Sequence, residues 1–160
     1  MQIRTARSPH EIDTVRRLFR EYHAELQVDL CFQGFEAELA GLPGKYGPPD
    51  GRLRLAVASA TAAGCVALRK IAPGTCEMKR LYVRPDFRST GLGRRLAVDI
   101  VSAARSLGYA RMRLDTLDRL TAAMQLYRAL GFEPIDPYYD NPLPGVRYWQ
   151  LDLKPGASRR

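Results

Sequence analysis

The stretch from residue 76 to residue 108 restricts the possible folds of this chain more than any other part. Residues 76–83 are an expected strand, which leads into a loop rich in arginine and glycine. Apolar residues then recur at helical spacing from Leu92 to Leu107, and Gly108 follows where helices commonly end. A strand that passes through a glycine loop into a long helix is typical of α/β domains, in which the helix covers a sheet.

The other patterns along the chain predict a single domain of the α/β (α+β) class. The 160 residues have the length of one ordinary domain, and no internal repeat or linker divides them. We expect a mixed central sheet of about seven strands, in the order β α α β β β α β α β β. The expected strands cover residues 2–6, 52–57, 65–71, 76–83, 110–116, 132–135 and 146–153, and the expected helices cover 9–26, 32–41, 92–107 and 122–130. The domain is placed at residues 1–154, and residues 155–160 are expected to be a disordered tail.

Two local signals predict where elements begin and end. The residues Ser8-Pro9-His10-Glu11 predict a capping box, in which Ser8 is the N-cap and Glu11 reaches back to it. The first helix should therefore begin at Pro9. Residues 60–64 are predicted to be the turn between the second and third strands.

The net charge of +8 is concentrated in one part of the chain. Residues 79–95 carry six basic side chains and one acidic one, whereas residues 1–50 carry six basic and eight acidic side chains. Such a positive region attracts anions, including nucleic acid, an acidic membrane surface or a phosphorylated ligand. Aromatic residues are not interleaved with the basic cluster as a base-stacking platform requires, so nucleic acid is an unlikely partner. The charge distribution favours a phosphate-bearing ligand at residues 79–95 and a cationic ligand elsewhere.

The three cysteines, Cys31, Cys65 and Cys76, predict neither a disulfide framework nor a metal site. Their number is odd, and no two have the C-x-x-C spacing. Free thiols are typical of a reducing compartment, so we expect a cytoplasmic protein. The chain has no apolar run of the roughly 20 residues that a membrane span needs, and its first residues lack the apolar core of a secretory signal. We therefore expect no membrane partner.

The loop after the strand 76–83 has the features of a diphosphate-binding site. Its motif is Arg88-x-x-Gly91-x-Gly93, placed directly before the long helix. Glycines let a ligand approach the backbone amides, and the helix N-terminus adds unpaired N–H groups and a positive dipole end. The segment lacks the Gly-Lys-Ser/Thr of nucleotide triphosphate loops and the third glycine of the dinucleotide motif. The alternative is a simple helix entry with exposed arginines.

A second motif extends this interpretation. Residues 123–132 read Ala-Met-Gln-Leu-Tyr-Arg-Ala-Leu-Gly-Phe, and they follow the glycine loop at the next predicted helix. With both motifs in this order, the sequence resembles the GCN5-related N-acetyltransferase (GNAT) superfamily, whose motifs are Arg/Gln-x-x-Gly-x-Gly/Ala and Ala-x-x-Leu-Tyr-x-x-x-Gly-Phe. The specific motifs lie within residues 77–132, and the expected element order extends the resemblance over nearly the whole chain.

The resemblance implies an N-acetyltransferase that uses acetyl-CoA as its cosubstrate and needs no metal. By this analogy, loop amides between Arg88 and Arg94 hold the pyrophosphate. The backbone from Leu81 to Val83 pairs with the pantetheine arm, and the amide near Leu81 donates to the thioester carbonyl. Members of the family are often homodimers. The implied coenzyme-binding residues are Leu81, Tyr82, Val83, Arg88, Ser89, Thr90, Gly91, Leu92, Gly93 and Arg94.

The resemblance also implies two catalytic residues. Tyr127 matches the tyrosine that protonates the departing thiolate, and Glu77 matches the glutamate that removes the amine proton in histone-type members. The alternatives are that Tyr127 is only a core aromatic and that Glu77 pairs with Lys79 or Arg80. Many members have an asparagine at the position of Leu120, so the coenzyme contact made by that asparagine is in doubt here.

The acceptor site is expected between residues 22–41 and the loop 136–146. Carboxylates and aromatic rings in both regions suit a cationic amine, and we select Tyr22, Phe32, Tyr138 and Tyr139 as acceptor-binding candidates. The expected acceptor is a primary amine of a small, amino-acid-like molecule, attacked directly in a ternary complex. The alternatives are a lysine or N-terminus of a protein, a protein that binds acetyl-CoA without catalysis, and a nucleic-acid-binding module.

Overall fold

The protein, seen in a computed structural model that describes residues 1–29 and 34–153, has the predicted order of elements. Its strands are β1 (Gln2–Thr5), β2 (Arg52–Ala58), β3 (Thr61–Ala72), β4 (Thr75–Val83), β5 (Arg111–Leu117), β6 (Glu133–Ile135) and β7 (Val146–Asp152). Its helices are α1 (Pro9–Leu26), α2 (Phe35–Ala40), α3 (Leu92–Ser106) and α4 (Thr121–Ala129), with 3-10 turns η2 (Gly44–Tyr46) and η3 (Pro85–Phe87). The predicted tail at 155–160 and the candidate Phe32 lie outside the described residues.

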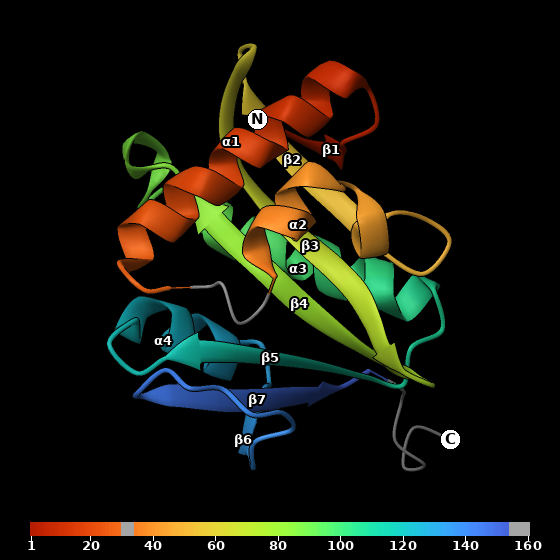
Figure 1. Cartoon of the computed structure of the whole chain (residues 1–160), viewed down its shortest axis with the longest axis vertical. Coiled ribbons are helices and arrows are strands. Elements are labelled where there is room, and N and C mark those ends of the chain that lie inside the picture. Colours follow the sequence, from red (N-terminus) through yellow and green to blue (C-terminus); the bar gives the residue numbers. More distant parts are fainter. Residues whose placement is uncertain (30–33, 154–160) are drawn as a thin grey trace.

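The strands form one mixed sheet in the order β1-β2-β3-β4-β5-β7-β6 (Figure 1). The pair β4 and β5 is parallel, and the other neighbouring pairs are antiparallel. The helix α3 connects the parallel pair, as parallel strands require a crossover connection. The predicted fold class and the sheet of about seven strands are therefore confirmed.

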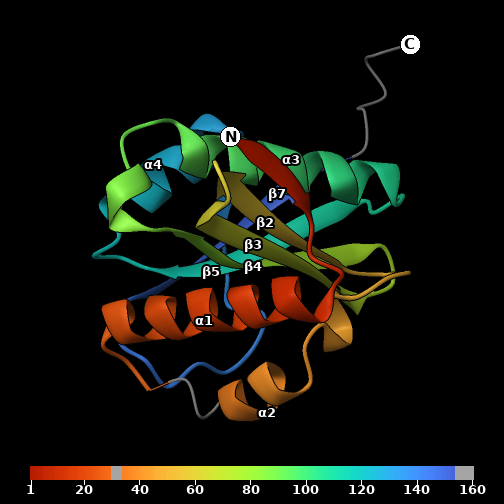
Figure 2. The same cartoon turned by 90° about the horizontal axis from the view of Figure 1, so that it is seen from above.

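Helices cover both faces of the sheet, α1 and α2 on one and α3 and α4 on the other (Figure 2). The core beneath α1 and α2 includes Val15, Leu18 and Phe19, all without exposed surface. On the opposite face, Leu96 and Ile100 of α3 are equally buried. These residues follow the helical spacing seen in the sequence, since a helix buries one stripe of its surface.

The start of α1 has the predicted capping box. The Ser8 hydroxyl accepts a hydrogen bond from the Glu11 amide at 3.1 Å, and the Glu11 carboxylate accepts one from the Ser8 amide at 3.1 Å. Two amides of the first turn, which have no partner within the helix, are thereby satisfied. The bonds to backbone amides lower the pKa of Glu11.

The predicted turn over residues 60–64 is wrong, because β3 already includes Gly64. The chain turns instead at Ser59 and Ala60, whose φ angles are +47° and +67°. Hairpin turns with two positive φ values usually contain glycine or asparagine, so this turn has no strong sequence signal. Gly64 serves close packing, since a Cβ there would lie 2.5 Å from the Tyr82 carbonyl oxygen.

Replacing Gly64 with alanine should therefore destabilise the fold. The added methyl group must displace the backbone of β4 at Tyr82, and overpacking of this kind costs about 2 kcal/mol. We expect the melting temperature of G64A to fall by about 4–8 °C. The control is Gly93→Ala, where the nearest atom to the new Cβ is Val83 Cγ2 at 3.8 Å. Equal melting temperatures for the two variants would contradict this prediction, because they would show that the β4 backbone shifts without loss of stability.

Within residues 1–29 and 34–153, no helix is long and apolar enough to cross a membrane. In the same part of the chain, no group of three or more His, Cys, Asp or Glu side chains could hold a metal ion. Cys65 and Cys76 are free and buried, and burial raises the pKa of both thiols. Neither is therefore a reactive thiolate at neutral pH.

Candidate active site

A cleft opens in the middle of the sheet because β4 and β5 separate. The two strands pair at only three positions, of which Glu77 opposite Arg113 is the last. Beyond this pair they diverge (Figure 1), and the backbone edge of β4 that faces β5 is left without a neighbouring strand. The cleft has a volume of about 630 Å³ and is lined by residues 78–83, the loop after β4, part of α4 and the end of α1.

A bulge bends β4 at the centre of this cleft. The register with β3 shifts between Cys65 and Ala67, and Arg80 has a positive φ of +59°. A bulge places two residues opposite one and increases the local twist, so it redirects the backbone amides that follow. These amides belong to Leu81 and its neighbours, which line the cleft.

The glycine loop closes one end of the cleft at the start of α3. Gly91 is the N-cap, with φ +83°, and no side chain caps the helix. A Cβ at Gly91 would have no atom within 4 Å, and one at Gly93 would have only open van der Waals contact. The first amides of α3 therefore face a space into which a ligand can approach closely, and the helix dipole favours an anion there.

Arg88 connects the glycine loop to α1. Its guanidinium donates to both carboxylate oxygens of Glu25, at 2.8 and 2.6 Å, and to the Val83 carbonyl at 2.9 Å. Of the expected coenzyme-binding residues, Thr90 and Arg94 do not line the cleft; Thr90 donates to the Phe87 carbonyl at 2.6 Å. The expected residues that do line it are Leu81, Tyr82, Val83, Arg88, Ser89, Gly91, Leu92 and Gly93.

Tyr127 lies on α4 and lines the same cleft as the backbone of Leu81. Its side chain is 7% exposed and packs against Phe132, with ring centroids 5.7 Å apart. Burial raises the pKa of Tyr127, and the nearby Tyr22 and Asp115 raise it further. The hydroxyl is therefore protonated at neutral pH, which suits a proton donor.

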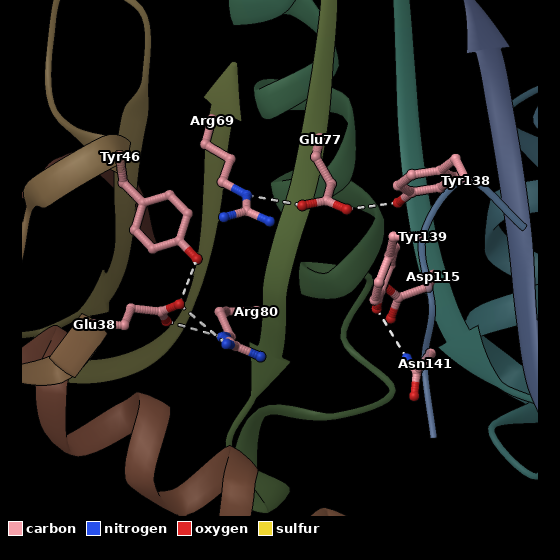
Figure 3. Close-up of polar contacts among 9 residues, drawn as sticks. All are labelled: Glu38, Tyr46, Arg69, Glu77, Arg80, Asp115, Tyr138, Tyr139 and Asn141. Carbon is pink, nitrogen blue, oxygen red and sulfur yellow. Dashed lines mark hydrogen bonds and ion pairs between the residues drawn. The ribbon is translucent and has the colours of Figure 1, made fainter. Parts of the chain in front are cut away.

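Glu77 is buried outside the lining of the cleft. It is 1% exposed and accepts hydrogen bonds from Arg69 Nε at 2.9 Å and from the Tyr138 hydroxyl at 2.6 Å (Figure 3). The ion pair is thus with Arg69 on β3, rather than with the sequence neighbours Lys79 or Arg80. Burial, followed by the charge of Glu77, raises the pKa of Tyr138.

Two of the acceptor candidates, Tyr138 and Tyr139, lie in the loop between β6 and β7. The rings of Tyr138, Tyr139 and Tyr148 contact one another, with centroids 5.4 to 5.7 Å apart. Tyr139 donates to Asp115 at 2.5 Å and accepts from Asn141 at 2.8 Å (Figure 3). Of the described candidates, Tyr22 lines the cleft, whereas Tyr138 and Tyr139 do not.

Two polar groups at this site are not marked by any motif in the sequence. One is the pair of Glu38 on α2 and Arg80 on β4, joined at 3.0 and 3.1 Å, with Tyr46 donating to Glu38 at 2.9 Å (Figure 3). The other is Asp115, which lines the cleft on β5. Asp115 follows Arg111 and Arg113 at the polar alternate positions of β5, so it has the signal of an ordinary strand residue.

The comparisons with known proteins agree with this geometry. The model of the "Acetyltransferase (GNAT) family" matches residues 12–132. An "Uncharacterized N-acetyltransferase C1271.07c" of Schizosaccharomyces pombe is 44% identical over 155 residues, which cover 96% of this chain and 95% of that protein. The chain belongs to the GNAT acetyltransferase family. It is therefore an acetyl-CoA-dependent N-acyltransferase, and the predicted family, enzyme class and cosubstrate are confirmed.

Solved structures of GNAT acetyltransferases have the same fold. An acetyltransferase from Staphylococcus aureus has a TM-score of 0.78 at 18% identity and covers 96% of this chain and 99% of its own. The PaiA N-acetyltransferase of Thermoplasma acidophilum, solved with coenzyme A, has a TM-score of 0.72 at 19% identity, over 95% of this chain and 99% of its own. At these identities the likeness concerns the fold.

Proposed function

We propose that this GNAT enzyme transfers the acetyl group of acetyl-CoA to a primary amine of a small molecule, by direct attack in a ternary complex. The observation that carries the proposal is that α2 and the loop after β6, which cover the expected acceptor site, both make side-chain hydrogen bonds to strands of the sheet. Glu38 of α2 pairs with Arg80, and the loop after β6 bonds to Glu77 and Asp115 through Tyr138 and Tyr139. A covered acceptor side favours a small molecule over the lysine of a folded protein.

The cleft suits two parts of acetyl-CoA: the pantetheine arm, which has amide groups like those of a peptide backbone, and the negatively charged diphosphate. The free edge of β4 from Leu81 to Val83 offers amide and carbonyl groups to the pantetheine arm, as an added strand would. The uncapped amides at Gly91 and Gly93 and the dipole of α3 suit the diphosphate. Arg88 is close to both and can contribute a charge-assisted hydrogen bond.

The chemistry requires a proton donor for sulfur and an acceptor for the amine proton. Tyr127 is the proposed donor, because it is buried, protonated and part of the cleft lining. The Leu81 amide is the proposed donor to the thioester oxygen as it becomes negative. Glu77, the base expected from the sequence, has its carboxylate engaged by Tyr138 and Arg69 and does not line the cleft, so direct removal of the amine proton calls for another group.

The proposal is tested by measuring coenzyme A release from acetyl-CoA with lysine, putrescine, tyramine and a lysine-containing peptide as acceptors. We expect an amide product from at least one small amine, identified by its mass. Its kcat/KM should exceed that of the peptide by about tenfold, equal to about 1.4 kcal/mol of transition-state binding. Faster acetylation of the peptide would contradict the small-molecule acceptor. Binding of acetyl-CoA without turnover of any amine would favour a non-catalytic protein.

A further inference from the structure

Two carboxylates flank the point where β4 and β5 separate, and they differ in what they face. Glu77 belongs to the last paired position and is enclosed by Arg69 and Tyr138. Asp115 is two residues beyond Arg113, which is the residue of β5 that pairs with Glu77. Its side chain therefore lies on the same face of the sheet as that of Glu77, at a position where β4 and β5 have separated. Of these two carboxylates, Asp115 lines the cleft and Glu77 does not.

Asp115 also belongs to the wall of a second, smaller cavity. This cavity has a volume of about 40 Å³, and the residues it shares with the cleft include Tyr22, Arg80 and Asp115. About 10–15 Å³ of such space is enough for one water molecule, so the cavity fits a group as small as a primary amine. A carboxylate between the cleft and a small cavity is placed to meet an acceptor nitrogen that approaches the thioester.

The loop after β6 orients this carboxylate. Tyr139 donates to Oδ2 of Asp115 at 2.5 Å, and the Asn141 amide in turn donates to the Tyr139 hydroxyl at 2.8 Å. Tyr148 donates to the Tyr139 carbonyl at 3.2 Å and packs against the Tyr139 ring. No hydrogen bond to Oδ1 is found among residues 1–29 and 34–153. One oxygen is thus fixed, while the other can accept from a ligand.

Charged and titratable groups surround Asp115 on several elements. Lys79 of β4, Tyr22 of α1, Tyr127 of α4 and the tyrosines of the loop and β7 lie close enough to interact with it electrostatically. Burial lowers the pKa of Lys79, whereas Asp115 acts to raise it. An ammonium group beside Asp115 would compensate the carboxylate directly, and an aromatic residue such as Tyr22 in the same wall suits a cation.

We propose that Asp115 binds the ammonium group of the acceptor and takes its proton, with Tyr139 as a positioning residue. The proposal rests on the proposed amine acetyltransferase function. One proton passes from nitrogen to Asp115, the nitrogen lone pair forms the N–C bond with the thioester carbon, and the C–S bond breaks. The sulfur takes a proton from Tyr127, the second nitrogen proton restores the Tyr127 hydroxyl, and the proton on Asp115 leaves to water. Glu77 then acts indirectly, by holding Tyr138.

A binding experiment tests the contact without requiring turnover. The full-length enzyme, with ¹³C-labelled aspartate and saturating coenzyme A, is titrated with n-butylammonium, and the Asp115 carboxyl resonance is identified by its loss in D115N. We expect this resonance to shift and to saturate, both in the wild type and in Asp152→Asn, which removes an exposed carboxylate from β7. A resonance that does not move overturns the proposal. Failure to bind coenzyme A at all would instead contradict the proposed function.

Kinetics with the best small amine separate Asp115 from Glu77. We expect Asp115→Asn to lower kcat/KM for the amine about 100-fold, in the usual range for loss of an acid or base. KM for acetyl-CoA and the melting temperature should stay close to those of the wild type, and D152N should retain its activity. Tyr139→Phe should lower kcat less and keep the same KM for acetyl-CoA. Full activity of D115N would overturn the proposal, as would a loss confined to Glu77→Gln when both variants are folded.

Discussion

Replacing Tyr127 with phenylalanine is expected to lower kcat about 500-fold, within the range for loss of a general acid. The variant keeps the ring, which packs against Phe132, and removes only the hydroxyl. KM for acetyl-CoA should change by less than about twofold, because an interaction made only in the transition state affects kcat and kcat/KM equally. The measurement is steady-state release of coenzyme A with the best small amine.

The pKa of Tyr127 adds a second readout. Burial raises it above the ordinary value of about 10, and the nearby Tyr22 and Asp115 raise it further. The hydroxyl is the active form as a donor, and it persists at every pH below the raised pKa. The wild-type rate should therefore show no loss from ionisation of Tyr127 up to about pH 10. A fall in kcat near pH 9 that disappears in Y127F would contradict the prediction that the buried Tyr127 hydroxyl stays protonated in this range.

Tyr109→Phe is the matched control for Y127F. Tyr109 is also 7% exposed, but it lies between α3 and β5, where its hydroxyl donates to the Asp50 carbonyl at 2.6 Å. Loss of this hydrogen bond costs about 1 kcal/mol of folding free energy and leaves the cleft unchanged. A Y127F enzyme with wild-type kcat would show that coenzyme A leaves without a tyrosine donor.

Features that depend only on residues adjacent in the sequence could be predicted. The capping box at Ser8 and the strand–loop–helix at 76–107 are local, since a few adjacent residues fix the backbone and orient its amides. The motif around Tyr127 is likewise contained within one helix and its end. The structure has these elements in the predicted order.

Contacts between distant segments could not be predicted in this way. Glu77 and Tyr138 are 61 residues apart, and Glu38 and Arg80 are 42 residues apart. Their pairing depends on the strand register and on how α2 and the loop after β6 cross the sheet. The same holds for Asp115, whose exposure to the cleft results from the separation of β4 and β5. The bulge at Arg80 had no signal, because arginine rarely has a positive φ.

A carboxylate at position 93 should have opposite effects on folding and on coenzyme binding. Gly93 is the second residue of α3, where the helix dipole favours an acidic side chain by about 0.5 kcal/mol. A Cβ at Gly93 meets only Val83 Cγ2 at 3.8 Å, so the side chain can be accommodated. Gly93→Asp should therefore melt at the wild-type temperature or slightly above it, as measured by thermal unfolding without ligand.

The same carboxylate would lie beside the proposed diphosphate site. A charge of −1 at about 7 Å from two phosphate charges costs about 4–5 kcal/mol at an effective dielectric constant of about 20. Calorimetry should therefore show that G93D binds coenzyme A about 1,000-fold more weakly than the wild type. Gly93→Asn is the matched control, since it has the same size without the charge, and it should lose far less affinity.

The two variants at Gly93 separate electrostatics from space. If G93D and G93N weakened binding equally, the close approach of the ligand to the α3 backbone would account for the loss, and charge would not. If neither weakened it, the diphosphate would bind away from the start of α3. Raising the salt concentration adds a third comparison: screening should recover part of the affinity of G93D and leave that of G93N little changed, because only the former opposes the ligand by its charge.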